Sequence, residues 1–437
     1  MSTCGNLIYY LSPAPDKQVQ CMKCKQLHDE DKILNPKPVS TSSLLGFIQN
    51  LQKLKAEQIK KKTDNIRVKG LSNYSCKLIS PLLTKYGLDK NTQEVKLLST
   101  MGQGSAFDCS HLSNRAFTIE FENLSIPEYG RDESCEYLKD TLKEISRVNE
   151  NEERLVPIFV DGDGHCLLHA VSRALIGREL FWHPLLTNLK DHFTKRQTGY
   201  KALLGDFIQD SEWSDIIKEA DPNYLPAYGE THGLRNIHVF GLANVLHRPI
   251  ILIDSLEGMR SKGDYCAVFL PALVPIEKCR GADGVLNKPI VIAWSSKGHN
   301  HFVPLVGVRG KPVPKYPISA LPKVWGLHQD LLYHYVEFSS GTCVIGGSKT
   351  LSETYLKKLL DAMNNHYQIL NGVAPTVVAE CYQYIYKPSG VVGMTAEMIT
   401  EAAHALVKEE RLYKCLTCAS VEQQELPCPL SFLEPGD

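Results

Sequence analysis

The sequence predicts an α+β protein in which helices pack against a central sheet that is mostly antiparallel or mixed. Residues 154–310 alternate between helical patterns and the short apolar runs that are typical of buried strands. Hydrophobic residues make up 43% of the chain and charged residues 22%, as in ordinary globular proteins. At 437 residues, the chain has the length of roughly two to four domains.

The individual elements follow from local periodicity and from the placement of glycine and proline. Helical spacing of apolar residues predicts helices at residues 43–62, 78–83, 138–145, 166–176, 180–193, 200–220, 234–246, 351–366, 376–386 and 396–407. Short apolar runs predict strands at residues 116–121, 156–160, 250–254, 265–270, 289–294 and 302–308.

These elements group into four regions. The first is a small cysteine-containing module, and the second is a helical and mixed extension. The third is the α+β core, and the fourth is a mostly helical region that follows a proline-spaced linker. Their expected bounds are 1–35, 36–153, 154–310 and 311–437.

Composition excludes several classes of protein. Lys+Arg 48 against Asp+Glu 49 gives a net charge of -1, so nothing indicates bulk attraction to nucleic acid or anionic membrane. No apolar run reaches the roughly 18–20 residues that span a bilayer, and the N-terminus lacks the pattern of a signal peptide. We therefore expect a cytoplasmic or nuclear protein whose 14 cysteines are reduced.

In a reducing compartment, Cys-x-x-Cys pairs indicate metal or redox chemistry. Cys21 and Cys24 follow a predicted hairpin pattern, and this short spacing lets two thiolates bind one tetrahedral zinc ion. The remaining ligands would come from Cys4 and His28, or from the second pair, Cys415 and Cys418. The alternative is a set of unrelated free thiols.

The chain is organised around a glycine-containing loop that joins the strand at 156–160 to the helix that begins at Cys166. Gly162 and Gly164 permit positive φ and keep side chains out of the loop. Unpaired N–H groups and a partial positive charge at a helix start stabilise a thiolate, the reactive form of cysteine. Amides of this loop, around Gly162, Gly164 and His165, can also stabilise an oxyanion. A lone cysteine here is otherwise simply a small buried residue.

A cysteine nucleophile needs a base. His301 opens the predicted strand at 302–308, directly after a glycine-containing turn. The loop, the cysteine and a second strand headed by a histidine together indicate nucleophilic catalysis more strongly than any one of them alone.

Three segments resemble the OTU family of cysteine deubiquitinases. They are residues 161–170, 246–250 and 301–305, which have the sequences DGDGHCLLHA, LHRPI and HFVPL. Further segments at 70–74, 172–182, 233–254 and 343–347 are similar to family members that act with valosin-containing protein, an AAA ATPase. Such members are longer, so we expect a fragment or a truncated relative.

The resemblance implies an OTU-like core and hydrolysis of isopeptide bonds at the C-terminal glycine of ubiquitin in polyubiquitin or ubiquitin conjugates. It also implies a role in Golgi and endoplasmic reticulum reassembly after mitosis. Cys166 would attack the carbonyl, and His301 would move the proton without a catalytic cofactor. Plausible walls for the Gly-Gly tail of ubiquitin are Asn236, Trp294 and Phe302.

The third catalytic residue departs from the family pattern. Many members place Asn or Asp two residues after the histidine, but here that position is Val303, and Asn300 would point to the opposite face of the strand. Asp163 is therefore our first candidate for the acid, and Asp161 is the second. Either carboxylate could instead only brace the loop through bonds to backbone amides.

Two other functions remain open. One is a zinc hydrolase, suggested by two pairs of histidines: His165 with His169, and His299 with His301. However, the glutamate that follows the first histidine in metalloproteases is missing. His169 is better explained as a core histidine. The second is a non-catalytic OTU-like module that binds ubiquitin or an ATPase, against which the intact Cys166 and His301 argue.

Overall fold

A computed structural model describes residues 18–20, 27–29, 73–89, 91–126, 128–205, 207–224, 234–261, 265–347, 350–382 and 395–408. The predicted helix at 43–62 lies outside these ranges. Strands β1 (Gln18–Gln20) and β2 (Leu27–Asp29) pair antiparallel, in register from Gln18 with Asp29 to Gln20 with Leu27.

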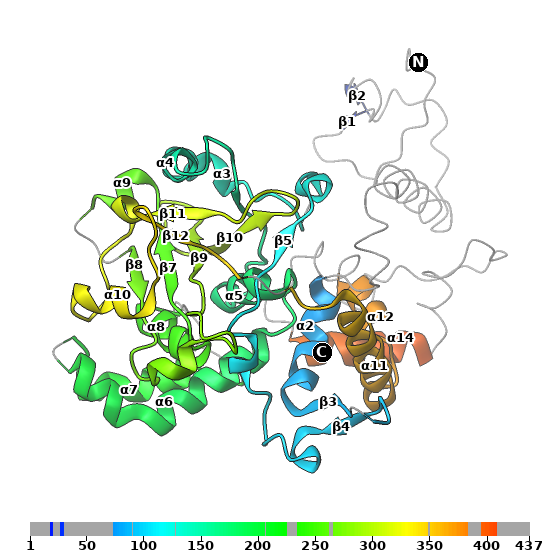
Figure 1. The fold of residues 1–437 in the computed structure, drawn as a ribbon. Helices are drawn as coiled ribbons and strands as arrows, with labels where there is room; N and C mark the ends of the chain where they lie inside the picture. Colours follow the sequence, from blue (N-terminus) through cyan, green and yellow to red (C-terminus); the bar gives the residue numbers. More distant parts are fainter. Residues whose placement is uncertain are drawn as a thin grey trace.

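The core is a mixed six-stranded sheet with the order β5-β10-β9-β7-β8, in which β6 also pairs with β10 (Figure 1). The pairs β5–β10 and β7–β9 are parallel, whereas β6–β10, β9–β10 and β7–β8 are antiparallel. The predicted mixed sheet is thus confirmed. The strands are β5 (Thr118–Ile119), β6 (Leu155–Pro157), β7 (Ile250–Ile253), β8 (Ala267–Phe269), β9 (Ile290–Trp294) and β10 (Phe302–Val308).

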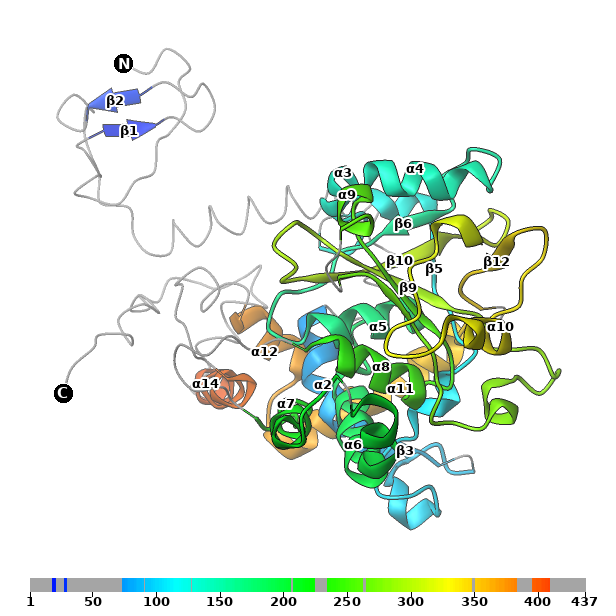
Figure 2. The same ribbon diagram turned by 90° about the vertical axis from the view of Figure 1, so that its left-hand side faces the viewer.

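Helices and smaller sheets surround this core (Figures 1 and 2). The helices are α2 (Asn73–Lys85), α3 (Ser134–Tyr137), α4 (Lys139–Arg147), α5 (Cys166–Ile176), α6 (Trp182–Leu204), α7 (Trp213–Glu219), α8 (Asn236–Val245), α9 (Leu256–Met259), α10 (Leu332–Tyr335), α11 (Glu353–Asn371), α12 (Pro375–Cys381) and α14 (Ala396–Lys408). Two-stranded sheets join β3 (Tyr86–Leu88) to β4 (Val95–Leu97) and β11 (Lys315–Pro317) to β12 (Thr342–Val344).

Strands β7, β9 and β10 are buried along their whole length, because both faces of the sheet are covered. Their side chains alternate between two cores. Ile250 and Ile292 pack in the cluster that includes α5, α6 and α8. Ile251 and Val291 face the opposite cluster, with α3, α4, β11 and β12. This double cover explains why the strands appear in the sequence as continuous apolar runs.

The helical stretches expected at 180–193 and 200–220 are divided differently. One helix, α6, runs from Trp182 to Leu204 without a break, and α7 follows after a short turn. Gly199 stays inside α6, where a β-carbon would lie 3.1 Å from Leu273 Cδ2. The glycine therefore marks a close approach between side chain and backbone rather than a helix end.

The described part of the region after residue 310 is mostly helical, as expected, but it also contains the two-stranded sheet of β11 and β12. Tyr316 and Cys343 of this sheet are fully buried or nearly so and complete the second core. Beyond it, α11, α12 and α14 pack with α2 into a separate helical group (Figure 1). In that group, Tyr74 stacks on Tyr382 with ring centroids 4.1 Å apart. Helix α2 thus lies between the C-terminal helices and α6 of the core.

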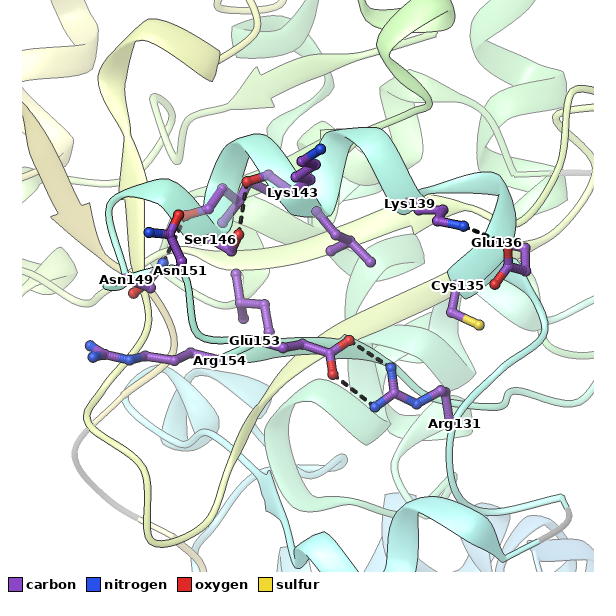
Figure 3. A pocket seen from close by; sticks show the side chains of 13 residues that line it. Arg131, Cys135, Glu136, Lys139, Lys143, Ser146, Asn149, Asn151, Glu153 and Arg154 are labelled. Atoms are coloured by element: carbon purple, nitrogen blue, oxygen red, sulfur yellow. Dashed lines mark hydrogen bonds and ion pairs between the residues drawn. The ribbon is translucent and has the colours of Figure 1, made fainter.

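A groove of about 300 Å³ lies between α3, α4 and β6 (Figure 3). Its charged side chains pair with one another: Arg131 Nη1 lies 2.6 Å from Glu153 Oε1, and Lys139 Nζ lies 3.5 Å from Glu136 Oε2. No residue of the nucleophile loop lines it. Across the described ranges, no helix is both long enough and apolar enough to cross a membrane.

Candidate active site

Cys166 is the first residue of α5, as predicted, and Gly164 before it adopts φ +93°. The carbonyl of His165 accepts hydrogen bonds from the amides of Leu168 at 2.9 Å and His169 at 3.0 Å, which closes the first turn. The helix ends at Gly177, where φ is +75°. The local sequence therefore places one partly buried thiol at the end of a tight loop.

The environment of the thiol differs from the expected stabilised thiolate. Burial raises the pKa of the Cys166 thiol, and the negative charge of Asp163 raises it further. The backbone N–H groups of Phe302 and Leu167 act against this increase without cancelling it. This environment favours the thiol over the thiolate, so a base is needed to activate Cys166.

His301 lies beside the nucleophile loop. A β-carbon on Gly162 would lie 3.7 Å from Nδ1 and 3.8 Å from Cε1 of His301, which are van der Waals distances, so the His301 ring lies directly beside the loop at Gly162. The next residue, Phe302, directs its N–H at the Cys166 thiol. The structure therefore brings the two predicted catalytic residues to one site, although within the described residues no hydrogen bond joins Cys166 to His301.

The loop amides are only partly available. The amide of His165 already donates to Asp163 Oδ1 at 3.1 Å, so it is committed to the loop itself. Of the predicted oxyanion set, the amide of Gly164 remains a candidate, and the amide of Cys166 itself is another. Gly162 lies beside the ring of His301.

Asp163 bonds to groups other than His301. Its carboxylate lies 2.9 Å from His169 Nε2 and 2.7 Å from Lys77 Nζ, besides accepting from the His165 amide. Although burial would raise the pKa of the Asp163 carboxyl, His169 and Lys77 hold it well below its usual value. The bonds support the bracing role that the sequence left open, and the catalytic role of Asp163 stays a prediction.

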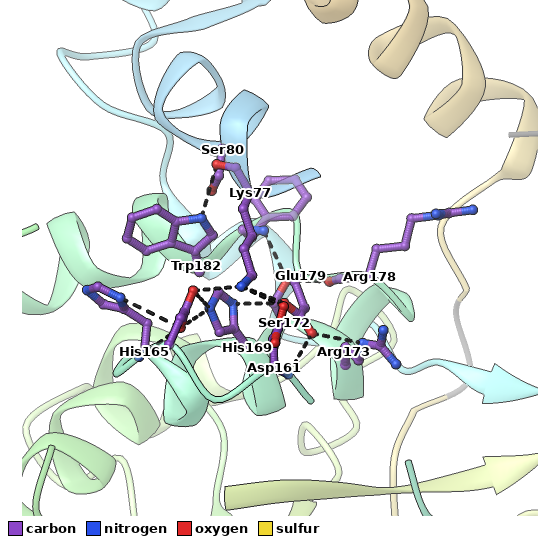
Figure 4. A network of polar contacts seen from close by, with 12 residues as sticks. Lys77, Ser80, Asp161, His165, His169, Ser172, Arg173, Arg178, Glu179 and Trp182 are labelled. Carbon is purple, nitrogen blue, oxygen red and sulfur yellow. Dashed lines mark hydrogen bonds and ion pairs between the residues drawn. The ribbon is translucent and has the colours of Figure 1, made fainter. Parts of the chain in front are cut away.

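Asp163 contacts an ionic network that the sequence did not reveal, whose members Lys77, His169 and Glu179 are labelled in Figure 4. Glu179, which is fully buried, accepts from the Asp161 amide at 3.1 Å. Its other carboxylate contacts are Arg173 Nε at 3.5 Å and His169 Nδ1 at 3.6 Å. His169 is fully buried, as expected for a core histidine. This network connects α5 to both carboxylates of the nucleophile loop.

A second brace holds the loop before His301. His299 Nε2 lies 2.7 Å from Asp254 Oδ2, and its ring stacks on Tyr265 with a centroid distance of 3.8 Å. Asp254 is fully buried at the end of β7 and accepts from Tyr137 Oη at 2.5 Å. Asp254, the buried acid beside the histidine strand, thus pairs with His299 rather than with His301. An aspartate closing a buried strand was the available sequence signal.

The predicted channel residues are mostly buried. Trp294 and Phe302 are only 8% and 4% exposed, their ring centroids lie 4.0 Å apart, and Trp294 Nε1 donates to the carbonyl of Tyr265 at 2.7 Å. Both rings therefore belong mainly to the packed interior, and little of their surface is open to a substrate. Asn236, partly buried, is the first residue of α8 and follows a segment outside the described residues.

The cysteines predicted to bind zinc lie outside the part of the chain that the structure describes, namely Cys4, Cys21, Cys24, Cys415 and Cys418. Within the described residues, no group of three or more His, Cys, Asp or Glu side chains is arranged to hold a metal ion. His165 and His169, the pair that suggested a zinc hydrolase, have ring centroids 6.3 Å apart.

Two family models match this chain. Residues 161–302 match the family model described as OTU-like cysteine protease, and residues 2–150 match the one described as VCIP135 N-terminal. The OTU domain of OTUD1 aligns with 39% of this chain and 96% of its own, at 16% identity and a TM-score of 0.26.

The chain is 50% identical over 423 residues to Deubiquitinating protein VCPIP1 of Rattus norvegicus and of Homo sapiens, which covers 96% of this chain. It spans about a third of those relatives, 34% of their length. Tumor necrosis factor alpha-induced protein 3 of Homo sapiens is 26% identical over 228 residues, 46% of this chain and 28% of its own. Residues 161–302 therefore form an OTU-like cysteine protease domain, preceded by a VCIP135 N-terminal domain.

Proposed function

We propose that this chain is a thiol-dependent deubiquitinase that hydrolyses isopeptide bonds at the C-terminal glycine of ubiquitin, in polyubiquitin or in ubiquitin conjugates. The observation that carries the proposal is Cys166 at the start of α5 with His301 facing the same loop. The match to an OTU-like cysteine protease and the 50% identity to proteins named as deubiquitinating support it.

The chemistry follows from these positions. His301 accepts the thiol proton as Cys166 Sγ attacks the carbonyl carbon of the ubiquitin glycine. Loop amides around Gly164 and Cys166 stabilise the oxyanion. When the tetrahedral intermediate collapses, the C–N bond breaks and His301 returns the proton to the leaving lysine amine. Water, activated by His301, then hydrolyses the thioester and restores the thiol.

A ubiquitin carrying a C-terminal electrophile tests this function. Wild type should form a covalent adduct, and Cys166→Ala should form none. Cys135→Ala is the matched control, because Cys135 is partly exposed in the groove beside α3, where it lines no part of the nucleophile loop. His301→Ala should bind the probe but react far more slowly. Binding without any adduct in wild type would favour the non-catalytic ubiquitin-binding module.

We also propose a structural zinc ion bound by Cys21 and Cys24, with the other ligands from Cys4 and His28 or from Cys415 and Cys418, and no cofactor for the catalytic steps. The antiparallel strands β1 and β2 on either side of the first pair support this placement, since such a hairpin is usual around a Cys-x-x-Cys knuckle. Metal analysis should find zinc in wild type and in Cys135→Ala, and lose it in Cys21→Ser/Cys24→Ser.

We further propose valosin-containing protein as a partner, in the cytoplasm with Golgi, endoplasmic reticulum or nuclear association. The resemblance of segments such as 70–74 and 233–254 to family members that act with this ATPase supports the proposal. Mixing the purified proteins and following their co-elution tests the partnership directly, and independent elution at micromolar concentrations would contradict it.

A further inference from the structure

We propose that Lys77, on helix α2 of the VCIP135 N-terminal domain, is a positioning residue for the nucleophile loop of the protease domain. It neutralises the two carboxylates on either side of Gly162 and holds the loop that presents Cys166. The inference deepens the proposed function and rests on it only for the cleavage readout.

The geometry is specific. Lys77 Nζ lies 2.9 Å from Asp161 Oδ2 and 2.7 Å from Asp163 Oδ2, so one ammonium group bridges two residues separated by a single glycine. The same nitrogen lies 3.9 Å from Glu179 Oε2. The Lys77 side chain is only 9% exposed, whereas those of both aspartates are 37% exposed. The lysine thus anchors a solvent-facing loop to the interior (Figure 4).

Charge explains why a cation is needed there. Three carboxylates face this point, from Asp161, Asp163 and Glu179, and the other basic side chains of the network, Arg173 and His169, lie on α5. Despite burial, which lowers it, the pKa of Lys77 is raised by these carboxylates, above all by Asp163. The ammonium group therefore stays charged, and its removal would leave excess negative charge beside Cys166.

That excess charge would act on the nucleophile. The negative charge of Asp163 already raises the pKa of the Cys166 thiol. Lys77 offsets this charge at 2.7 Å, so its loss should make the thiolate harder to form. A lysine that only supported packing would have no such effect on the thiol.

Helix α2 is held in place on two sides. Toward the core, Trp182 Nε1 donates to the Lys77 carbonyl at 3.3 Å, and the His183 amide donates to Ser80 Oγ at 3.0 Å. On the other side, Ser75 Oγ donates to the Pro375 carbonyl at 3.4 Å, within the helical group of the C-terminal region. The helix that carries Lys77 is therefore fixed both to the protease domain and to the region after residue 350, and this fixes the position of Lys77 beside the loop.

The test compares Lys77→Met, Lys77→Arg and the matched control Lys85→Met, which removes an exposed lysine from the same helix. The main readout is the pH dependence of Cys166 alkylation by iodoacetamide, followed by mass spectrometry of its peptide. Lys77→Met should shift the profile upward by about one pH unit, a rate loss of about tenfold near neutral pH. Lys77→Arg should stay within about threefold of wild type, and Lys85→Met should match it.

A second variant separates charge from packing. Lys77→Met/Asp161→Asn removes one charge of each sign and should recover part of the alkylation rate. The inference is overturned if Lys77→Met keeps the wild-type profile, or if the double variant reacts or folds no better than Lys77→Met. Alkylation does not require ubiquitin. If wild type fails to cleave di-ubiquitin while the shift persists, the proposed function fails and the positioning role stands.

Discussion

Glu179 offers the sharpest stability test of the buried network. The change Glu179→Gln keeps the shape of the side chain and removes its negative charge. The carboxylate is fully buried and lies 3.5 Å from Arg173 Nε, 3.6 Å from His169 Nδ1 and 3.9 Å from Lys77 Nζ. Removing it leaves three buried cationic or titratable groups with less compensation.

The magnitude follows from burial. Breaking a buried ion pair by removing one partner destabilises a protein by roughly 3–5 kcal/mol. Glutamine retains an oxygen to accept from the Asp161 amide, now 3.1 Å away, so the lower end of that range applies, about 3 kcal/mol. By contrast, an exposed ion pair contributes only about 0–1 kcal/mol.

Urea denaturation of wild type, Glu179→Gln and Glu153→Gln measures the difference. Glu153 is the matched control, because it pairs with Arg131 through two short contacts of 2.6 and 2.8 Å but is 44% exposed. Glu179→Gln should lower the midpoint without changing the slope of the transition. Equal free energies of unfolding for the two variants would refute the argument from burial.

Three further predictions follow from single contacts. Asp254→Asn should slow di-ubiquitin cleavage about tenfold or more, because it weakens the 2.7 Å contact to His299, two residues before His301, the proposed base. It should leave the alkylation profile of Cys166 unchanged. Burial lowers the pKa of His183 to about 4, so the unfolded chain binds more protons below about pH 6.5 and stability should fall on acidification toward pH 4. Calorimetry should show that His183→Gln loses less stability than wild type over the same acidification. Gly177→Ala should lower the free energy of unfolding by about 2 kcal/mol or more, because φ is +75° and the new methyl group would overlap a phenylalanine ring. Gly102→Ala should cost less, because φ is +69° but the space around it is open, so only the backbone strain remains.

Local patterns predicted the parts of the site that are contiguous in the chain. The glycine-containing loop and Cys166 could be identified because an apolar strand pattern changes to a helical one within about ten residues. His301 could be identified because it follows a turn between two apolar runs. The same reasoning predicted the mixed sheet, because strands covered on both faces are apolar throughout.

Long-range charge pairs carry no such pattern. Lys77 is 84 residues from Asp161, and Tyr137 is 117 residues from Asp254. The sequence signal for Lys77 was its position among apolar residues of a helix, such as Cys76 and Ile79, which are buried in the structure. Sequence reasoning named Asp163 and then Asp161 as candidate acids, but it did not reveal that Asp163 contacts His169 or that Asp254 contacts His299.

The central claim is that Cys166 is the nucleophile of a deubiquitinase. The most direct test is cleavage of a panel of di-ubiquitins of different linkage by wild type and Cys166→Ala, each with and without a zinc chelator. The account predicts cleavage by wild type that survives the chelator and disappears in Cys166→Ala. Cleavage that persists in Cys166→Ala and is lost to the chelator would contradict it and favour a metal-dependent hydrolase.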